Sequence, residues 1–247
     1  MVVFKTNPSN RNPGTKHIVV KVYNIQSVIF PITMSSRTEL SIFTGLAGDI
    51  DCAIDWPEHT PRGWALVLHP HPLHGGARDN KVVTTIARAC VQHGLVALRP
   101  NFRGVGGSNG EFDKAIGETA DMHELLKQFA QQHPDVAALP WVLGGFSFGT
   151  AVAAQLYSGL TDHRPEAVIL TGTAAQRFTF RDISLPDDTL LVHGETDDVV
   201  PLNEAMEFAR THELPMVVIP DASHFFHGKL LTLRGLVQQR LAAMTLK

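Results

Sequence analysis

The chain is poor in cysteine. Only Cys52 and Cys90 occur among its 247 residues, each in an apolar context, too few for the disulfide framework of a small secreted protein. Two buried free thiols are expected instead, which fits a reducing cytoplasm. A long hydrophobic run is also lacking, because the apolar stretch 17–32 is interrupted by polar residues such as Lys21 and Asn24. That pattern suits neither a signal peptide nor a membrane span, so we predict a cytoplasmic protein.

A marked excess of charge is lacking as well. The formal net charge is -3 and the pI lies near 6.5, and Lys and Arg are scattered without a dense basic run. A protein that binds nucleic acid or an anionic membrane through electrostatics needs a concentrated basic surface. The sequence therefore indicates neither partner.

Residues 1–33 differ from the rest of the chain. They include a segment rich in Asn, Pro and Ser, and the regular pattern of strands and helices starts only after Met34. We therefore expect an N-terminal extension over 1–33, outside the main fold, and a single domain over 34–247. With 44% hydrophobic residues, a chain of this length can bury one substantial core.

Apolar runs alternate with segments of helical spacing along the main part of the chain. Eight strands are predicted, over Arg37–Phe43, Ile50–Trp56, Trp64–His69, Leu95–Arg99, Trp141–Phe146, Ala167–Thr171, Thr189–His193 and Met216–Ile219. Five helices are predicted, over Asp79–Gln92, Ala115–Gln132, Phe148–Ser158, Pro201–Arg210 and Phe225–Leu241. Strands that alternate with helices imply a mainly parallel sheet. The first two strands are joined by too short a link for a crossover and should form an antiparallel hairpin at one edge.

The pentapeptide 145–149 has the form G-x-S-x-G, with Ser147 at its centre. It follows a predicted strand and precedes a predicted helix, which is the setting of a nucleophile elbow. In such an elbow a sharp turn exposes the serine and the flanking glycines let strand and helix approach closely. Ser147 is therefore the candidate nucleophile, although Gly-rich turns with a serine also occur in proteins without this chemistry.

A serine nucleophile needs a base and an acid that orients the base. Two adjacent acids, Asp197 and Asp198, follow the seventh predicted strand, and His224 follows the eighth. The resulting chain order of Ser, Asp and His separates this arrangement from the chymotrypsin and subtilisin orders. His193 and His227 are alternative bases, but a structural role is favoured for both because one ends a strand and the other lies in a helix-like stretch.

These motifs together resemble those of the α/β hydrolases. The similarity is strongest to small bacterial serine hydrolases related to dienelactone-hydrolase and Xaa-Pro-dipeptidyl-peptidase-like proteins. It is carried from about Arg37 to the C-terminus by the segments 69–76, 101–108, 145–149, 193–201 and 223–228. The resemblance implies an α/β-hydrolase fold with an eight-stranded, mostly parallel sheet flanked by helices. It says little about the substrate, because this fold supports many reactions.

The resemblance also assigns roles. Asp197 aligns with the family's catalytic acid in the pattern Gly194-x-x-Asp197-x-x-Val200-Pro201 and is favoured over Asp198, which can instead cap the following helix. The oxyanion hole is expected from the backbone N–H of Phe148 and from the loop after the third strand. There Pro70 and Pro72 have no N–H, so His71 is the first choice and Leu73 the second.

Two interpretations are open for each of the other notable side chains near these loops. His69, His71 and His74 are spaced closely enough to suggest a metal site, but the loop already has a role in the serine mechanism, and no cofactor or metal is expected. Arg103 is a candidate for binding a substrate carboxylate or phosphate, although buttressing of the loops, together with Asp79, is favoured.

The segment between the sixth and seventh predicted strands runs only from Gly172 to Asp188 and leaves no room for a large lid. Phe178 and Phe180 in this segment are candidate walls of a shallow, open substrate site, or equally anchors of the loop. The favoured function is a serine hydrolase of small carboxylic esters, with thioesters or amides as further substrates. The rival is a non-catalytic protein of the same fold that binds a ligand or partner.

Overall fold

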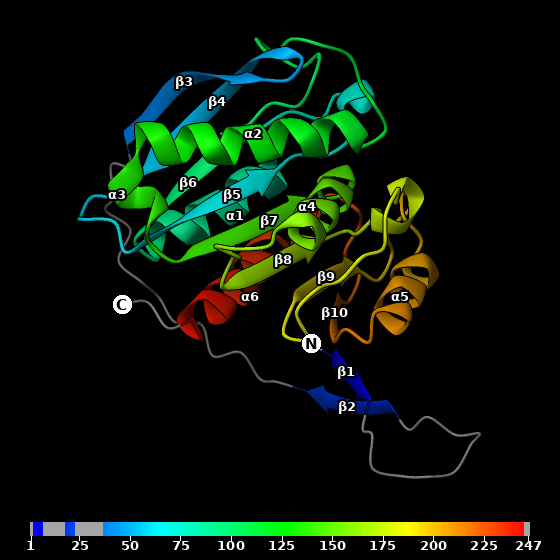
Figure 1. The fold of residues 1–247 in the computed structure, drawn as a ribbon. Coiled ribbons are helices and arrows are strands. Elements are labelled where there is room, and N and C mark those ends of the chain that lie inside the picture. The colour runs from blue at the N-terminus through cyan, green and yellow to red at the C-terminus, as the bar shows by residue number, and fades with distance from the viewer. Residues whose placement is uncertain (1, 7–17, 23–36, 245–247) are drawn as a thin grey trace.

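A sheet of ten strands forms the centre of the molecule (Figure 1), in the order β2-β1-β10-β9-β8-β7-β5-β6-β4-β3. The computed structural model describes residues 2–6, 18–22 and 37–244. The strands are β1 (Val2–Thr6), β2 (Ile18–Val22), β3 (Arg37–Gly45), β4 (Gly48–Trp56), β5 (Gly63–Leu68), β6 (Leu95–Pro100), β7 (Trp141–Phe146), β8 (Ala167–Thr171), β9 (Leu190–Gly194) and β10 (Met216–Ile219).

The central part of the sheet is parallel and consists of the neighbouring strands β10, β9, β8, β7, β5 and β6. Both ends of the sheet are antiparallel. β3 and β4 form the expected antiparallel hairpin at one edge, next to β6. Every residue of β5, β6 and β7 is buried, which explains their nearly continuous apolar sequences. All eight strands predicted from the sequence are present.

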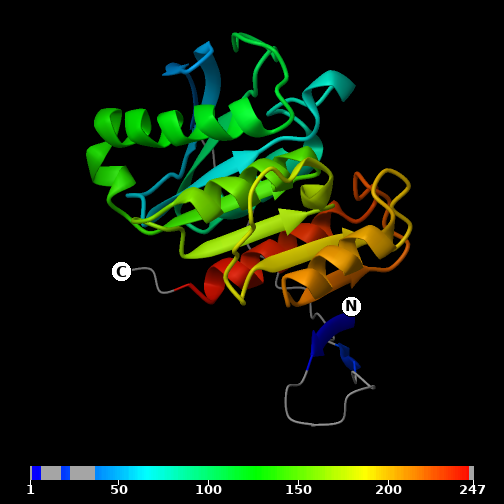
Figure 2. The ribbon, with the colours of Figure 1, turned by 45° about the vertical axis from the view of Figure 1, so that its right-hand side comes forward.

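Helices cover both faces of the sheet (Figures 1 and 2). They are α1 (Lys81–Gln92), α2 (Ile116–Gln132), α3 (Pro134–Ala137), α4 (Phe148–Gly159), α5 (Leu202–Thr211) and α6 (Leu230–Ala242), with short 3-10 helices η1 (Pro72–His74) and η2 (Ala175–Phe178). Alternate residues of β5 serve opposite cores: Leu66 packs with side chains of α2 and α4, and Val67 with those of α1 and α6. None of the described helices has the length and hydropathy needed to cross a bilayer.

Helix α6 begins later than the sequence predicted. Apolar residues at helical spacing suggested a start at Phe225, whereas the helix starts at Leu230. Phe226 and Gly228 have φ values of 52° and 70°, and a residue with positive φ cannot continue a right-handed helix. Phe226 is buried in the core from a turn, so its apolar character does not report helical periodicity.

Two strands come from the segment that the sequence indicated to be an extension. β1 pairs antiparallel with β10, and β2 pairs antiparallel with β1, so that the sheet continues beyond the eight predicted strands. The predicted domain boundary after residue 33 lies outside the described residues.

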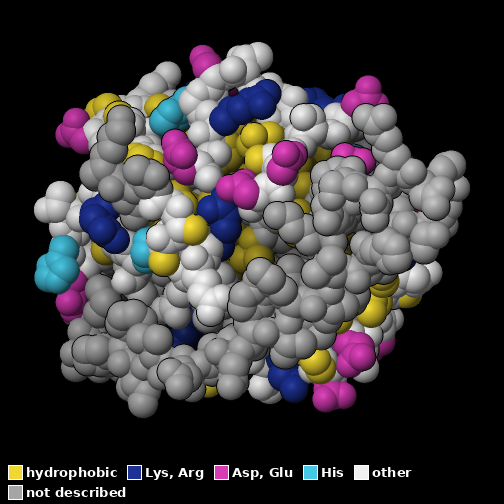
Figure 3. All heavy atoms as spheres, turned by 90° about the horizontal axis from the view of Figure 1, so that it is seen from below, with side chains coloured by type: hydrophobic (Ala, Val, Ile, Leu, Met, Phe, Trp, Pro, Cys, Tyr) yellow, Lys and Arg dark blue, Asp and Glu magenta, His cyan; other side chains and the backbone are white. Residues whose placement is uncertain are grey.

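Between β8 and β9 the chain contains only η2 and connecting loops, with no large lid. The carboxyl ends of the parallel strands lead into the loops and helix starts that carry the candidate site residues. On the face shown in Figure 3, acidic and basic side chains of the described residues are interspersed.

Candidate active site

Ser147 occupies a strained turn between β7 and α4. Its φ and ψ are 52° and -120°, a conformation that costs free energy for any residue with a side chain and that is characteristic of a nucleophile elbow. Two hydrogen bonds hold the turn: the Ser147 N–H donates to the carbonyl of Thr171 over 3.0 Å, and the Thr150 hydroxyl donates to the carbonyl of Ser147 over 2.6 Å. These two hydrogen bonds therefore maintain the strained turn.

The two glycines of the pentapeptide are needed for close packing. A Cβ atom on Gly145 would lie 2.5 Å from the carbonyl oxygen of Gly149, and one on Gly149 would lie 2.5 Å from that of Leu68. Both neighbours are backbone atoms that cannot move aside without shifting β5 or α4. The glycines thus allow the helix to start directly above the strands.

Ser147, His224 and Asp197 are joined by hydrogen bonds. The Nε2 atom of His224 lies 2.9 Å from Ser147 Oγ, and its Nδ1 atom lies 2.7 Å from Asp197 Oδ2. All three side chains are buried, with exposed fractions of 6%, 2% and 7% for the serine, histidine and aspartate residues. Because the carboxylate can only accept, Nδ1 carries a proton and Nε2 is free to accept one from the serine.

The loop after β9 fixes Asp197. Its Oδ1 atom accepts hydrogen bonds from the N–H groups of Val199 and Val200, over 3.0 and 2.8 Å. Burial alone would raise the pKa of Asp197, but the hydrogen bond and charge of His224, together with the Val200 N–H, outweigh it and lower that pKa. Asp198, the alternative acid, has an exposed side chain, and the structure places Asp197 rather than Asp198 against His224.

The other two histidines considered as bases lie elsewhere. His227 is exposed, with its Nδ1 atom 3.5 Å from the Ser223 hydroxyl. His193 is fully buried behind Asp197, with Nε2 at 3.3 Å from Asp197 Oδ2, a contact that sequence reasoning missed. Gly172 was also missed: its φ is 55°, and a Cβ atom there would lie 3.3 Å from the Cε1 atom of the His224 ring. Only the position of His193 four residues before Asp197 hinted at its contact.

The loop after β5 presents the second expected oxyanion donor. His71 precedes η1, and its Nδ1 atom accepts the N–H of Leu73 over 3.2 Å, so the second-choice amide is already engaged. Phe148 is the first residue of α4, and the first N–H groups of a helix have no acceptor within it. The rings of His71 and Phe148 are 5.2 Å apart, so the two expected donors belong to neighbouring residues.

His69 has both ring nitrogens occupied by backbone. Its Nδ1–H donates to the Pro70 carbonyl over 2.7 Å, and its Nε2 atom accepts the N–H of Phe102 over 2.8 Å. Burial lowers the pKa of His69 to about 4, so the ring is neutral. His71 and His74 stack with ring centroids 4.4 Å apart. Among the described residues no three His, Cys, Asp or Glu side chains form a group that could hold a metal ion.

Aromatic rings lie beside the loop after β5. Phe178 from η2 is 5.0 Å from Phe148 and 5.6 Å from His71, measured between ring centroids. Phe112 joins the same group, 4.5 Å from His71; it lies in an irregular loop, where no periodicity could have identified it. Phe180 instead stacks against the guanidinium of Arg181, 4.8 Å away. Of the two candidate wall residues, only Phe178 thus contacts the rings next to Ser147.

Arg103 is engaged within the protein. Its Nε and Nη2 atoms donate to the two carboxylate oxygens of Asp121, over 2.5 and 3.1 Å, and this bidentate contact raises the pKa of Arg103. Asp79 similarly accepts from Arg99 Nη1 over 2.9 Å. These contacts favour the buttressing role of Arg103 and Asp79 over direct contact with a substrate.

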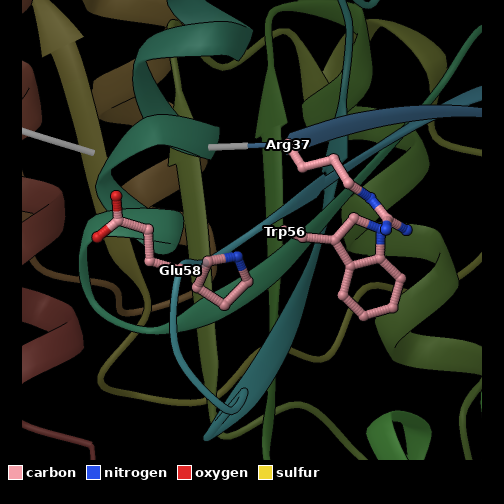
Figure 4. A pocket seen from close by; sticks show the side chains of 4 residues that line it. Arg37, Trp56 and Glu58 are labelled. Atoms are coloured by element: carbon pink, nitrogen blue, oxygen red, sulfur yellow. The ribbon is translucent and has the colours of Figure 1, made fainter. Parts of the chain in front are cut away.

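An open depression lies at the other end of the strands from Ser147 (Figure 4) and is lined by Arg37, Trp56, Pro57 and Glu58. Trp56 ends β4, which runs antiparallel to β6, so this site is near the amino ends of the parallel strands. Its lining contains no serine, histidine or cysteine. Because Ser147 follows the carboxyl end of β7, the depression and Ser147 lie at opposite ends of the strands.

Comparison with known proteins gives the family. The family described as "Serine aminopeptidase, S33" matches residues 71–178. An uncharacterized protein of Rickettsia prowazekii (strain Madrid E) is 33% identical over 178 residues, covering 67% of this chain and 72% of that protein. A Xanthomonas campestris structure, reported as an α/β serine hydrolase without lid, is 33% identical with a TM-score of 0.74 and covers 87% of this chain and 97% of its own.

A dienelactone hydrolase from Anabaena variabilis shares the fold, with a TM-score of 0.67, 19% identity, and coverage of 85% of this chain and 98% of its own. The ten-stranded sheet includes the eight strands of the predicted architecture, and no large lid is present. Together with the relatives that are 33% identical, these observations establish that the chain belongs to the α/β serine hydrolases.

Proposed function

We propose that the protein cleaves small carboxylic esters through an acyl-enzyme on Ser147. The observation that carries this proposal is the unbroken hydrogen-bond series from Ser147 Oγ through the His224 ring to Asp197, over 2.9 and 2.7 Å. It is located at a strained strand-to-helix turn, where a serine is presented to substrate. A ligand-binding protein without catalysis would have no need of this alignment.

In the first half of the reaction, Ser147 Oγ attacks the ester carbonyl carbon while its proton passes to His224 Nε2. The carbonyl oxygen becomes an oxyanion, which under this proposal accepts hydrogen bonds from the N–H groups of Phe148 and His71. The C–O bond to the alcohol then breaks, and the leaving oxygen takes the proton from Nε2. The acyl group remains on Ser147.

In the second half, a water molecule gives a proton to His224 Nε2 and attacks the acyl carbon. The bond from that carbon to Ser147 Oγ then breaks, Oγ takes the proton back from Nε2, and the acid is released. During both halves the imidazole is transiently a cation. The Asp197 carboxylate, whose pKa is lowered, stays ionised and stabilises that cation through Nδ1–H. Asp197 therefore orients the base without accepting its proton.

The absence of a large lid between β8 and β9 supports small substrates that enter an open site. Phe178 and Phe112, both partly exposed beside Phe148, offer an apolar surface for the acyl group or the alcohol. Thioesters and amides require the same attack on a carbonyl carbon and are further substrates under this proposal. Cys52 and Cys90 are buried free thiols, which supports a cytoplasmic location.

Labelling by a fluorophosphonate, read by intact mass, tests the nucleophile without knowledge of the natural substrate. Wild type should gain one adduct, Ser147→Ala none, and Ser223→Ala, which removes a neighbouring serine of the His224 loop, one adduct as in wild type. Hydrolysis of p-nitrophenyl acetate should follow the same pattern. Folded wild-type protein that gains no adduct would favour the rival proposal of a non-catalytic binding protein.

A further inference from the structure

A second histidine approaches the carboxylate of Asp197. His193 is the next-to-last residue of β9 and is fully buried, with an exposed fraction of 0%. Its Nε2 atom lies 2.8 Å from the carbonyl oxygen of Val200 and 3.3 Å from Asp197 Oδ2. The same Oδ2 atom receives the Nδ1–H of His224 over 2.7 Å. Two imidazoles thus converge on one carboxylate oxygen.

The surroundings of His193 fix its protonation state. A carbonyl can only accept, so the ring carries its proton on Nε2. Its Nδ1 atom is buried and has no hydrogen-bond partner among the described residues, so a second proton would be an unsatisfied buried donor. Burial lowers the pKa of His193, and His224 lowers it further, against the opposing effects of Val200, Asp197 and Glu204. His193 is therefore a neutral donor.

The contacts of His193 complete a closed set of hydrogen bonds and contacts with the loop after β9. Asp197 Oδ1 accepts the N–H of Val200 over 2.8 Å, and the carbonyl of the same Val200 accepts the N–H of His193. The imidazole thereby connects the strand end to the residue that turns the loop back toward Asp197. Loss of this donor would leave a buried carbonyl unpaired and would free the Oδ2 side of the carboxylate from one of its two neighbouring N–H groups.

We propose that His193 is a positioning residue of the hydrolytic reaction: its Nε2–H bonds the Val200 carbonyl and lies close to Asp197 Oδ2, which holds the loop so that Oδ2 stays directed at His224. This inference rests on the proposed function. A neutral donor suits this position better than a cation would, because a fixed second charge on Oδ2 would compete with the imidazolium that forms on His224 during catalysis. The second N–H also lowers the proton affinity of the carboxylate, which keeps the shared proton on His224 Nδ1.

The test compares His193→Met with His193→Gln, two side chains of similar length of which only glutamine can donate a hydrogen bond. His193→Met should lower kcat for p-nitrophenyl acetate, and the rate of fluorophosphonate labelling, by about 10- to 100-fold with KM unchanged. His193→Gln should recover to within a few-fold of wild type. His163→Leu is the control, because it removes another ring that bonds a carbonyl, that of Ala137, over 2.7 Å, and it should label like wild type.

The low-field proton NMR signal of the hydrogen bond between His224 and Asp197 gives a readout that needs no substrate. It should shift in His193→Met and return in His193→Gln. Thermal melts establish that each variant is folded, and His193→Leu supplies the comparison without a donor if His193→Met does not fold. Equal rates for folded Met and Gln variants would overturn the positioning role. Wild type that neither labels nor hydrolyses esters would instead overturn the proposed function, with the NMR comparison still deciding the role of His193.

Discussion

Mild acid should weaken the fold through the buried ring of His69. In the folded protein this ring is neutral, because burial lowers its pKa from an ordinary 6.5 to about 4. Its two nitrogens join the loop after β5 to the loop after β6, through Pro70 and Phe102. A proton on Nε2 would turn the acceptor of the Phe102 N–H into a second donor facing it.

The direction of the change in the free energy of unfolding follows from which state of the protein binds the proton. Between pH 6.5 and pH 4 the unfolded chain binds a proton on His69 that the folded chain excludes, so the free energy of unfolding falls as the pH falls through this window. Below the folded pKa both states are protonated and the loss is complete. The difference between the two pKa values corresponds to about 3 kcal/mol in total, of which about 2 kcal/mol is lost by pH 5. That is a large part of the stability of an ordinary domain.

Urea unfolding at pH 7 and pH 5 would measure this effect in wild type and His69→Gln. The variant should be less stable at pH 7, because it loses packing and hydrogen bonds, yet it should lose about 2 kcal/mol less than wild type between the two pH values. The other histidines are shared and largely cancel in this comparison. His59→Gln, which removes an exposed histidine, is the control and should behave like wild type. Equal losses in wild type and His69→Gln would refute the neutral, buried His69.

Three substitutions test the elbow and its partners. Asp197→Asn should lower kcat by about 10⁴-fold in ester hydrolysis; a loss below tenfold would speak against Asp197 as the orienting acid. Gly149→Ala places a Cβ atom 2.5 Å from the Leu68 carbonyl oxygen and should destabilise the protein by about 1–3 kcal/mol or more, which denaturant unfolding would measure; unchanged stability would contradict the close packing. Gly172→Ala, at a φ of 55° and against the His224 ring, should lower kcat more than it raises KM, and a pure KM effect would argue against displacement of that ring.

The parts of the fold that could be predicted are those in which local pattern and tertiary environment agree. β5 and β7 are buried on both faces, so every position is apolar and the strands are visible in the sequence. The elbow is visible for a different reason: two close backbone approaches require glycine at residues 145 and 149, and that requirement leaves a short motif. Sequence order then placed an acid and a histidine after later strands of the same parallel sheet.

What could not be predicted depends on contacts between segments far apart in the chain. The sequence favoured a buttressing role for Arg103 over a substrate anion without naming its partner, and the partner, Asp121 in α2, comes from a distant segment. His193 ended a predicted strand, but the direction of its ring depends on how residues 195–200 fold back toward it. Phe226 had the spacing of a helix and the φ of a turn. In each case the local sequence is compatible with more than one conformation or contact, and tertiary packing selects among them.

The same kind of contact explains how a site without a large lid can be preformed. The Asp51 carboxylate accepts a hydrogen bond from the Asn101 side-chain amide over 3.0 Å and pairs with the Arg78 guanidinium over 2.5 Å. The backbone N–H of Arg78 in turn donates to the side chain of Asn101 over 2.9 Å. This network ties β4 to the loops after β5 and β6, and His69 ties those two loops to each other. A donor for an oxyanion must be held in place before the charge develops. Buried polar contacts at the bases of the loops can provide that rigidity without a lid that closes over Ser147.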